Sequence, residues 1–405
     1  MPQAATVLTA RRLYDGSRLH DDPIVVLEDG RIASISAGCA SSTRALSAAP
    51  AGAHVLDFPE ATLAPSFFDI HIHGAAGHDV MEASPEALAA IGAFLASRGT
   101  ARFLATTVTA SIDATLRAVA GLARLIGRQG EARQAASAAA RPLGIHLEGP
   151  FLSHAKRGVH PPAFLLEPDI ALFDRIYDAA EGHVRLMTLA PELPGAPQLA
   201  AHAVARGVRV SVGHSNATAA ETRAAIAAGA TSATHTFNAM RPLDHREPGI
   251  LGTVLTDDSL FAELICDGIH SAPEMTKLWW RAKGPERAIL VTDAMSATGM
   301  PDGDYRLGEL TVQVANGRAT SEGALAGSVL TLDRALANFL AFTGATLEQG
   351  LRLLTGNPAT LTGFQSEAGL LAPGGAANLV AVSPEGRLAA SFVDGILVSV
   401  PVLDF

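Results

Sequence analysis

The sequence predicts an α/β protein: a (β/α)8 TIM barrel with a small β-sandwich domain built from both chain termini. Two observations lead to this prediction. Both ends of the 405-residue chain are rich in short strand patterns, and the region between them alternates strand and helix patterns. Strands that alternate with helices form parallel sheets, and eight such units close into a barrel. We place the small domain at 1–60 plus 366–405 and the barrel, the expected catalytic domain, at 61–365.

The terminal segments carry hairpin signals. Asp29 and Gly30 separate two β-rich runs near the N-terminus, and "PEG" at 384–386 and "VDG" at 393–395 do the same near the C-terminus. Such turn residues between apolar alternating runs are typical of hairpins. Two similar ends around a different middle indicate one domain assembled from both.

The first barrel helix is predicted at 84–99. Ser84 is a suitable N-cap, Pro85 suits the first helical position, and Gly99 can end the helix. Its apolar face comprises Leu88, Ile91 and Leu95. The alanine-rich run at 131–141 is interpreted as a helix or a surface loop and not as a linker.

Eight strands are predicted in the barrel region. They lie at 67–74, 101–110, 142–150, 183–192, 208–215, 232–239, 261–270 and 288–296. Alanine-rich helical stretches separate them, as a parallel barrel requires.

The composition excludes several classes of partner. Hydrophobic residues make up 48% of the chain, which is enough for a large core. A net charge of −10 argues against nucleic acid or an anionic membrane as partner. The sequence shows neither a secretion signal nor an apolar run of ~18 residues, and its two cysteines, Cys39 and Cys266, suit a reducing compartment. We therefore expect a cytoplasmic protein.

Imidazoles and carboxylates recur at the C-terminal ends of six predicted strands, where barrel enzymes carry their active sites. These residues are His71, His73, His146, Glu148, His214, His235, Asp267, His270 and Asp293. One such residue alone would be interpreted as a polar strand end. The whole set indicates a metal site, because buried charge is costly unless it is paired or bound to metal.

The chemistry of the ligands narrows the choice of metal ion. His71 and His73 alternate along one strand, so both imidazoles face the same side. Nitrogen and oxygen donors without thiolate suit Zn²⁺, Fe²⁺ or Mn²⁺. Glu148 is the candidate to bridge two ions. Asp293 could exchange a proton with a metal-activated water, whose pKa falls toward ~7.

The pattern of "HIHG", single histidines on the fifth and sixth strands and an aspartate on the eighth resembles the amidohydrolase superfamily. Within it, "GIHLEGPF", "KRGVH", "VSVGHSNAT", "THTFNAM", "REPG", "DGIH", "VTDAM" and "LAGSVLTL" resemble the N-acetylglucosamine-6-phosphate deacetylase family. The resemblance runs from about residue 20 to residue 400. Many superfamily members carry a carboxylated lysine on strand four, which "RLMTLAPE" lacks; in this family the glutamate of "HLEGP" takes that place.

The resemblance implies a metal-dependent hydrolysis of the acetamide of N-acetyl-D-glucosamine 6-phosphate. Glu148, His214 and His235 would bind the essential ion, and His71 and His73 a second one. One or two divalent ions per chain are expected, with zinc placed before iron, manganese or cobalt.

The resemblance also assigns roles around the substrate. Asp293 would take a proton from water and deliver it to the leaving amine, and His160 would orient or stabilise the carbonyl. Arg246 and the backbone at Asn238 and Ala239 would bind the phosphate, since a guanidinium suits a dianion. The remaining substrate-binding residues would be Val159, Asp267, His270, Leu325, Ala326 and Gly327. Members of the family typically form homodimers.

Three alternatives stay open at this point. One is another amidohydrolase, either a cyclic amidase or an N-acetylgalactosamine-6-phosphate deacetylase. The second is a non-catalytic scaffold, although such a protein would be expected to have lost metal ligands. The third is a phosphosugar sensor, which would not need Asp293.

Overall fold

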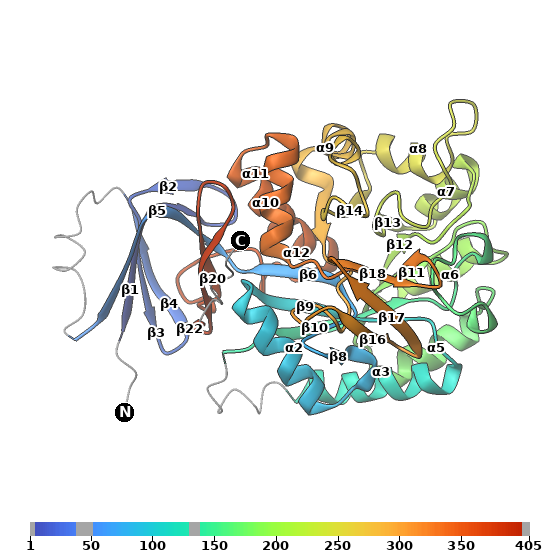
Figure 1. Cartoon of the computed structure of the whole chain (residues 1–405), viewed down its shortest axis with the longest axis horizontal. Coiled ribbons are helices and arrows are strands. Elements are labelled where there is room, and N and C mark those ends of the chain that lie inside the picture. Colours follow the sequence, from blue (N-terminus) through green and yellow to red (C-terminus); the bar gives the residue numbers. More distant parts are fainter. Residues whose placement is uncertain (1–4, 38–51, 129–137, 399–405) are drawn as a thin grey trace.

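The computed structural model describes residues 5–37, 52–128 and 138–398. Its largest sheet is parallel and consists of β6 (Phe67–Ile72), β9 (Thr100–Thr107), β10 (Arg141–Glu148), β11 (Val184–Leu189), β12 (Arg209–Val212), β13 (Ala230–Ala233), β14 (Phe261–Ile265) and β15 (Ala288–Val291). A parallel bridge between Ile72 and Ala294 joins its two edges. The predicted eight-stranded barrel is confirmed, with each strand inside or within two residues of its predicted range (Figure 1).

Helices surround this barrel. They are α2 (Pro85–Ser97), α3 (Ile112–Gly127), α5 (Ile170–Ala179), α6 (Ala196–Ala205), α7 (Ala219–Ala227), α8 (Gly249–Thr256), α9 (Pro273–Arg287), α10 (Leu332–Thr343), α11 (Leu347–Leu354) and α12 (Gly356–Thr362), with single turns η1 (Val80–Glu82), η2 (His154–Lys156) and η3 (Pro162–Phe164). The predicted cap of α2 is present, because the Ser84 side chain accepts a hydrogen bond from the Ala87 N–H. No described helix has the length and apolar character needed to cross a membrane.

Strands from both ends of the chain share a second sheet. It contains β1 (Thr6–Tyr14), β2 (Leu19–Asp21), β3 (Ile24–Glu28), β4 (Arg31–Ser36), β5 (His54–Pro65), β20 (Leu379–Val382), β21 (Leu388–Val393) and β22 (Ile396–Val398). Strand β20 pairs with β5, and the three predicted hairpin turns connect β3 to β4, β20 to β21 and β21 to β22. Figure 1 shows this small β-domain beside the barrel. Only Ser66 separates β5 from β6, the first barrel strand.

A small antiparallel sheet follows the last barrel strand and was not predicted. It consists of β16 (Gly303–Leu307), β17 (Leu310–Ala315), β18 (Arg318–Ser321) and β19 (Ala324–Leu325), and a two-stranded hairpin, β7 (Gly74–Ala75) with β8 (His78–Asp79), follows β6. Val312 and Val314 of β17 pack with Val108 and Met295 near the barrel mouth.

Two expectations fall partly or wholly outside the described residues. Most of the run at 131–141 lies there, and its last residue, Arg141, begins β10. Cys39 lies there as well, whereas Cys266 is a buried free cysteine.

Candidate active site

The strand ends bring the predicted metal ligands together at one mouth of the barrel. His71 lies in β6 and Glu148 ends β10, while His214, His235 and Asp293 follow β12, β13 and β15 by two residues each. None of these side chains is exposed, and Asp293, the most accessible, belongs to a residue only 8% exposed. All of them except His71, together with His73, line a cavity of about 260 Å³.

Glu148 is at the centre of the cluster. Its Oε1 lies 3.4 Å from the His71 Nε2 and 3.3 Å from the Nε2 atoms of both His214 and His235. Its Oε2 lies 3.2 Å from the His73 Nε2. The two oxygens of one carboxylate therefore face four imidazoles, two from the first strand and one each from the fifth and sixth.

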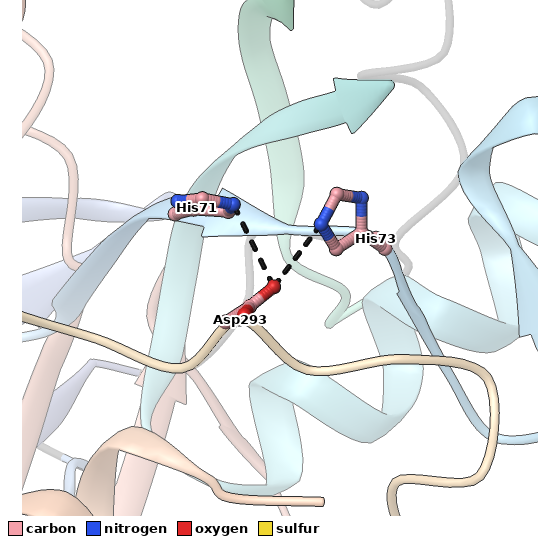
Figure 2. A group of neighbouring side chains, drawn as sticks. All are labelled: His71, His73 and Asp293. Atoms are coloured by element: carbon pink, nitrogen blue, oxygen red, sulfur yellow. Dashed lines mark ion pairs between the residues drawn. The ribbon is translucent and has the colours of Figure 1, made fainter. Parts of the chain in front are cut away.

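Asp293 faces the first-strand pair from the other side. Its Oδ1 lies 3.6 Å from the His71 Nε2 and 3.1 Å from the His73 Nε2, and Figure 2 shows both rings directed at this oxygen. Burial opposes ionisation, but the hydrogen bond from His73 and the charge of His71 outweigh it and hold the pKa of Asp293 below its usual range. Asp293 is therefore an ionised carboxylate in the metal-free site.

The outward nitrogen of three histidines fixes their tautomer. The Nδ1 atoms of His71, His73 and His214 lie 3.2 Å from the Glu263 Oε2, 3.0 Å from the Thr106 carbonyl and 3.0 Å from the Lys156 carbonyl. The Thr106 and Lys156 carbonyl oxygens can only accept, and the Glu263 carboxyl oxygen can accept in the same way. Each Nδ1 therefore carries a hydrogen, and in the neutral ring, the form that binds metal, the Nε2 lone pair points inward. This is the arrangement of metal-binding histidines.

Unsatisfied atoms inside the cluster indicate what could bind there. The His71 Nε2 and the Glu148 Oε1 have no hydrogen-bond partner among the described residues. The Nε2 atoms of His214 and His235 lie 3.0 Å apart and face each other. A divalent cation between these atoms would satisfy all of them, so the residues fit the ion that the donor set implies.

His160 differs from these ligands. Its Nδ1 accepts hydrogen bonds from the Thr109 backbone N–H at 3.3 Å and from the Thr109 hydroxyl at 2.8 Å. Its Nε2 therefore carries the hydrogen and points at the cavity, 3.6 Å from the Glu148 Oε2. Burial and the neighbouring His214 lower the pKa of His160 to about 3, so the ring is neutral. Although a ring nitrogen of His160 lies close to a Glu148 carboxylate oxygen and a His214 ring nitrogen, this tautomer makes His160 a hydrogen-bond donor.

The backbone is strained at three of the strand ends. His214, His235 and Asp293 have positive φ angles of 46°, 29° and 51°. Residues other than glycine rarely adopt this left-handed region, and each instance costs about 1–3 kcal/mol. The strain turns these side chains from the strand direction into the cavity mouth.

The predicted substrate residues divide into two groups. Those that line the cavity with the metal ligands are Val159, His160, Asn238, Ala239, His270, Leu325 and Gly327. Three others do not. Asp267 holds His270 through a 2.6 Å contact with its Nδ1, Ala326 is fully buried, and Arg246 is exposed on the loop before α8.

Sequence reasoning missed several residues around the cluster. Glu263 and Thr109 contact His71 and His160, and Asp69 accepts a hydrogen bond from Thr292, next to Asp293. A signal existed for Glu263, which is the one charged residue in the apolar strand "FAELI". His146 was expected among the strand-end group, but both of its ring nitrogens are satisfied by Ile70 and Thr188, so it is structural.

Comparison with known families agrees with this geometry. Residues 62–398 match the family model described as "Amidohydrolase family". The chain belongs to the amidohydrolase family.

Among curated relatives, this amidohydrolase is 40% identical over 298 residues to an N-acetylglucosamine-6-phosphate deacetylase of Lysinibacillus sphaericus, covering 73% of this chain and 75% of the relative. It is 36% identical to an N-acetylgalactosamine-6-phosphate deacetylase of Escherichia coli, covering 97% and 99%. The crystal structure of N-acetyl-D-glucosamine-6-phosphate deacetylase from Mycobacterium smegmatis superposes with a TM-score of 0.87 at 37% identity, covering 97% of this chain and 100% of that one.

Proposed function

We propose that this amidohydrolase hydrolyses the acetamide of N-acetyl-D-glucosamine 6-phosphate to acetate and D-glucosamine 6-phosphate, in amino-sugar catabolism and recycling. The observation that carries the proposal is the ring of four imidazoles around Glu148, with Asp293 beside it. Support also comes from relatives of that name that are 35% to 40% identical to the chain. The complete ligand set argues against a scaffold or a sensor.

In this proposal Glu148, His214 and His235 hold the essential ion, and His71 with His73 holds a second. Bound divalent metal supplies a Lewis acid that polarises the amide carbonyl and activates water. The buried imidazoles, in their neutral form, and the central carboxylate suit this task because they supply lone pairs and one negative charge. One or two zinc ions per chain are proposed.

Asp293 moves the proton. As an ionised carboxylate, its Oδ1 accepts a proton from the attacking water, and the same oxygen then protonates the amine nitrogen as the C–N bond breaks. His160 donates its Nε2–H to the carbonyl oxygen, where negative charge develops in the transition state. The hydrogen bonds from Thr109 keep this donor in place.

The cavity wall binds the sugar. His270, fixed by Asp267, and the segment at Leu325–Gly327 supply contacts on one side, and Val159, Asn238 and Ala239 supply others. The backbone near Asn238 and Ala239 together with Arg246 is proposed to bind the phosphate. Because Arg246 is exposed outside the cavity of its own chain, this role requires either a loop movement or a second copy of the chain.

We also propose that the protein is a cytoplasmic homodimer. Each chain would have a small β-domain at 1–60 plus 366–405 and a barrel domain at 61–365.

An Arg246→Ala variant tests the phosphate contact. We expect the variant to bind the phosphorylated sugar roughly ten- to a hundredfold more weakly, because a charged hydrogen bond contributes ~1.5–3 kcal/mol to binding. Its affinity for the unphosphorylated sugar should not change. An equal loss for both sugars would indicate a structural arginine.

The decisive experiment is acetate release from N-acetylglucosamine 6-phosphate by purified protein, with and without a chelator. The galactosamine epimer and unphosphorylated N-acetylglucosamine are run beside it. We expect the highest kcat/KM for the glucosamine phosphate and loss of turnover after chelation. Preference for the epimer would redirect the substrate assignment, and absence of acetate from all three would refute the deacetylase proposal.

A further inference from the structure

Glu263 is a buried carboxylate to which the proposed reaction gives no role. It lies in the middle of β14, where all five residues are buried, and its own exposure is 0%. Burying an ionised carboxylate is costly unless a partner compensates for the lost water. Its presence in an otherwise apolar strand therefore requires a reason.

One oxygen of Glu263 joins two of the metal-ligand segments. The Oε2 lies 3.2 Å from the His71 Nδ1 and accepts a hydrogen bond from the His235 backbone N–H at 3.3 Å. The Oε1 has no hydrogen-bond partner among the described residues. The side chain of Glu263 is thus directed at His71, and the strand end that carries His235 helps to hold it.

The other histidine ligands have weaker hydrogen-bond partners at their Nδ1 atoms. His73 and His214 direct their Nδ1–H groups at neutral backbone carbonyls, and the His235 Nδ1 has no hydrogen-bond partner among the described residues. A carboxylate behind an imidazole fixes its tautomer and raises its basicity as a ligand more than a carbonyl does. The carboxylate thus supports the first-strand pair, which lies on the Asp293 side of the cluster.

We propose that Glu263 is a positioning residue for the second metal ion, acting through His71. It holds the His71 Nδ1–H toward β14 and directs the Nε2 lone pair at the space between Glu148 and Asp293. Occupancy of the His71–His73 site then depends on Glu263, while the ion held by Glu148, His214 and His235 does not. The inference rests on the metal centre of the proposed function and is independent of which sugar is the substrate.

The test compares metal binding in wild-type protein and in Glu263→Met and Glu263→Gln variants. Methionine has a similar length but no carboxylate, and glutamine keeps an oxygen acceptor without the charge. Metal-free protein is titrated with Co²⁺ against a competing chelator, and stoichiometry is read by elemental analysis and by Co²⁺ absorption. We expect Glu263→Met to weaken the second ion about 10- to 100-fold, with a smaller loss for Glu263→Gln and an unchanged first ion.

Two controls separate positioning from general destabilisation. His71→Ala should lose the same ion as Glu263→Met. Asp333→Asn removes another buried carboxylate, which pairs with Arg98 away from the cluster, and should lower Tm without changing metal binding.

Several results would overturn the inference. They are unchanged second-ion affinity in the Glu263 variants, parallel loss of both ions, or a wild-type protein that binds one ion only. The last result would leave a one-metal deacetylase intact, so the two proposals fail separately. If Glu263→Met does not fold, the Glu263→Gln titration decides alone.

Discussion

Thr109 and Glu263 contact two site histidines through the same atom, Nδ1, with opposite effects on the proton. The Thr109 N–H donates to His160, which leaves the hydrogen on the Nε2, whereas Glu263 accepts from His71, which leaves the Nε2 with a lone pair. In the proposed reaction, the first ring would donate to the substrate and the second would bind metal. Identical side chains at one barrel mouth thus acquire different chemistry.

The first residue-scale prediction concerns His160. His160→Ala should reduce kcat about 10²- to 10³-fold, as expected when one donor to the developing negative charge is removed. Metal content should stay at the wild-type value because the Nε2 carries a hydrogen. His214→Ala is the matched comparison and should lose metal. Metal loss in His160→Ala would show that His160 is a ligand instead.

A second prediction concerns Asp293. Asp293→Asn keeps the size of the side chain but cannot accept or return a proton, so kcat should fall about 10²- to 10⁴-fold. Binding of the substrate, measured by calorimetry, should change little because the sugar and phosphate contacts lie elsewhere. Near-normal kcat would assign the proton to another group, and His270 would be the next candidate.

The site residues at strand ends could be predicted from the sequence, but the residues that hydrogen-bond to them from behind could not. Glu148 and His214 follow recognisable strands, so barrel topology alone brings them to one mouth. The contact of His71 with Glu263 spans 192 residues and that of His160 with Thr109 spans 51. Local pattern does not determine which atom of a distant strand lies behind an imidazole.

Among the elements, the small sheet β16–β19 forms part of the cavity wall. Leu307 ends β16 and Leu325 ends β19, and both line the cavity. Val312 in β17 belongs to the same apolar cluster as Leu307 and is fully buried. This sheet escaped prediction because its strands are short and half of the residues of β17 are exposed, so its apolar pattern is brief.

The prediction for this element is that Val312→Asp raises KM about tenfold or more and leaves the metal content unchanged. A buried unpaired carboxylate would loosen the sheet and the wall that it forms, while the strand ends of the barrel stay in place. Gln313→Asp, at the exposed neighbouring position, is the control and should behave as wild type. Metal loss in Val312→Asp would mean that the sheet also supports the ligands.

For the molecule as a whole, the ligand cluster makes two properties depend on pH in opposite directions: the stability of the metal-free protein and its affinity for metal. Burial favours the neutral form of His73, but hydrogen bonds to Asp293 and Glu148 outweigh it and raise its pKa from 6.5 to about 9 in the metal-free protein. A pKa raised by folding stabilises the protein fully below the unfolded value, and this contribution is lost as pH rises through the folded value. Because a metal ion binds only the neutral ring, the affinity for metal rises with pH over the same interval.

We therefore expect the Tm of the metal-free protein to fall between pH 6.5 and 9, while the increase in Tm caused by added Zn²⁺ grows. Differential scanning calorimetry with chelator or with zinc measures both quantities. His73→Gln, which removes one of the two titrating rings, should make the metal-free curve less steep, while His71, whose pKa, despite its burial, is also raised by its carboxylate neighbours, keeps part of the slope. A metal-free Tm that rises with pH across this interval would contradict the assignment.

The barrel and the small β-domain followed from alternation and turn residues, since both depend on short-range pattern. Their junction has a consequence for synthesis on the ribosome. Pro65, two residues before the start of β6, pairs with Leu379 of β20, so β5 keeps an unpaired edge until the chain beyond the barrel has been made. Exposed strand edges pair readily with other chains. In a nascent chain of this protein, β5 is therefore open to pairing with other chains until β20 has been made.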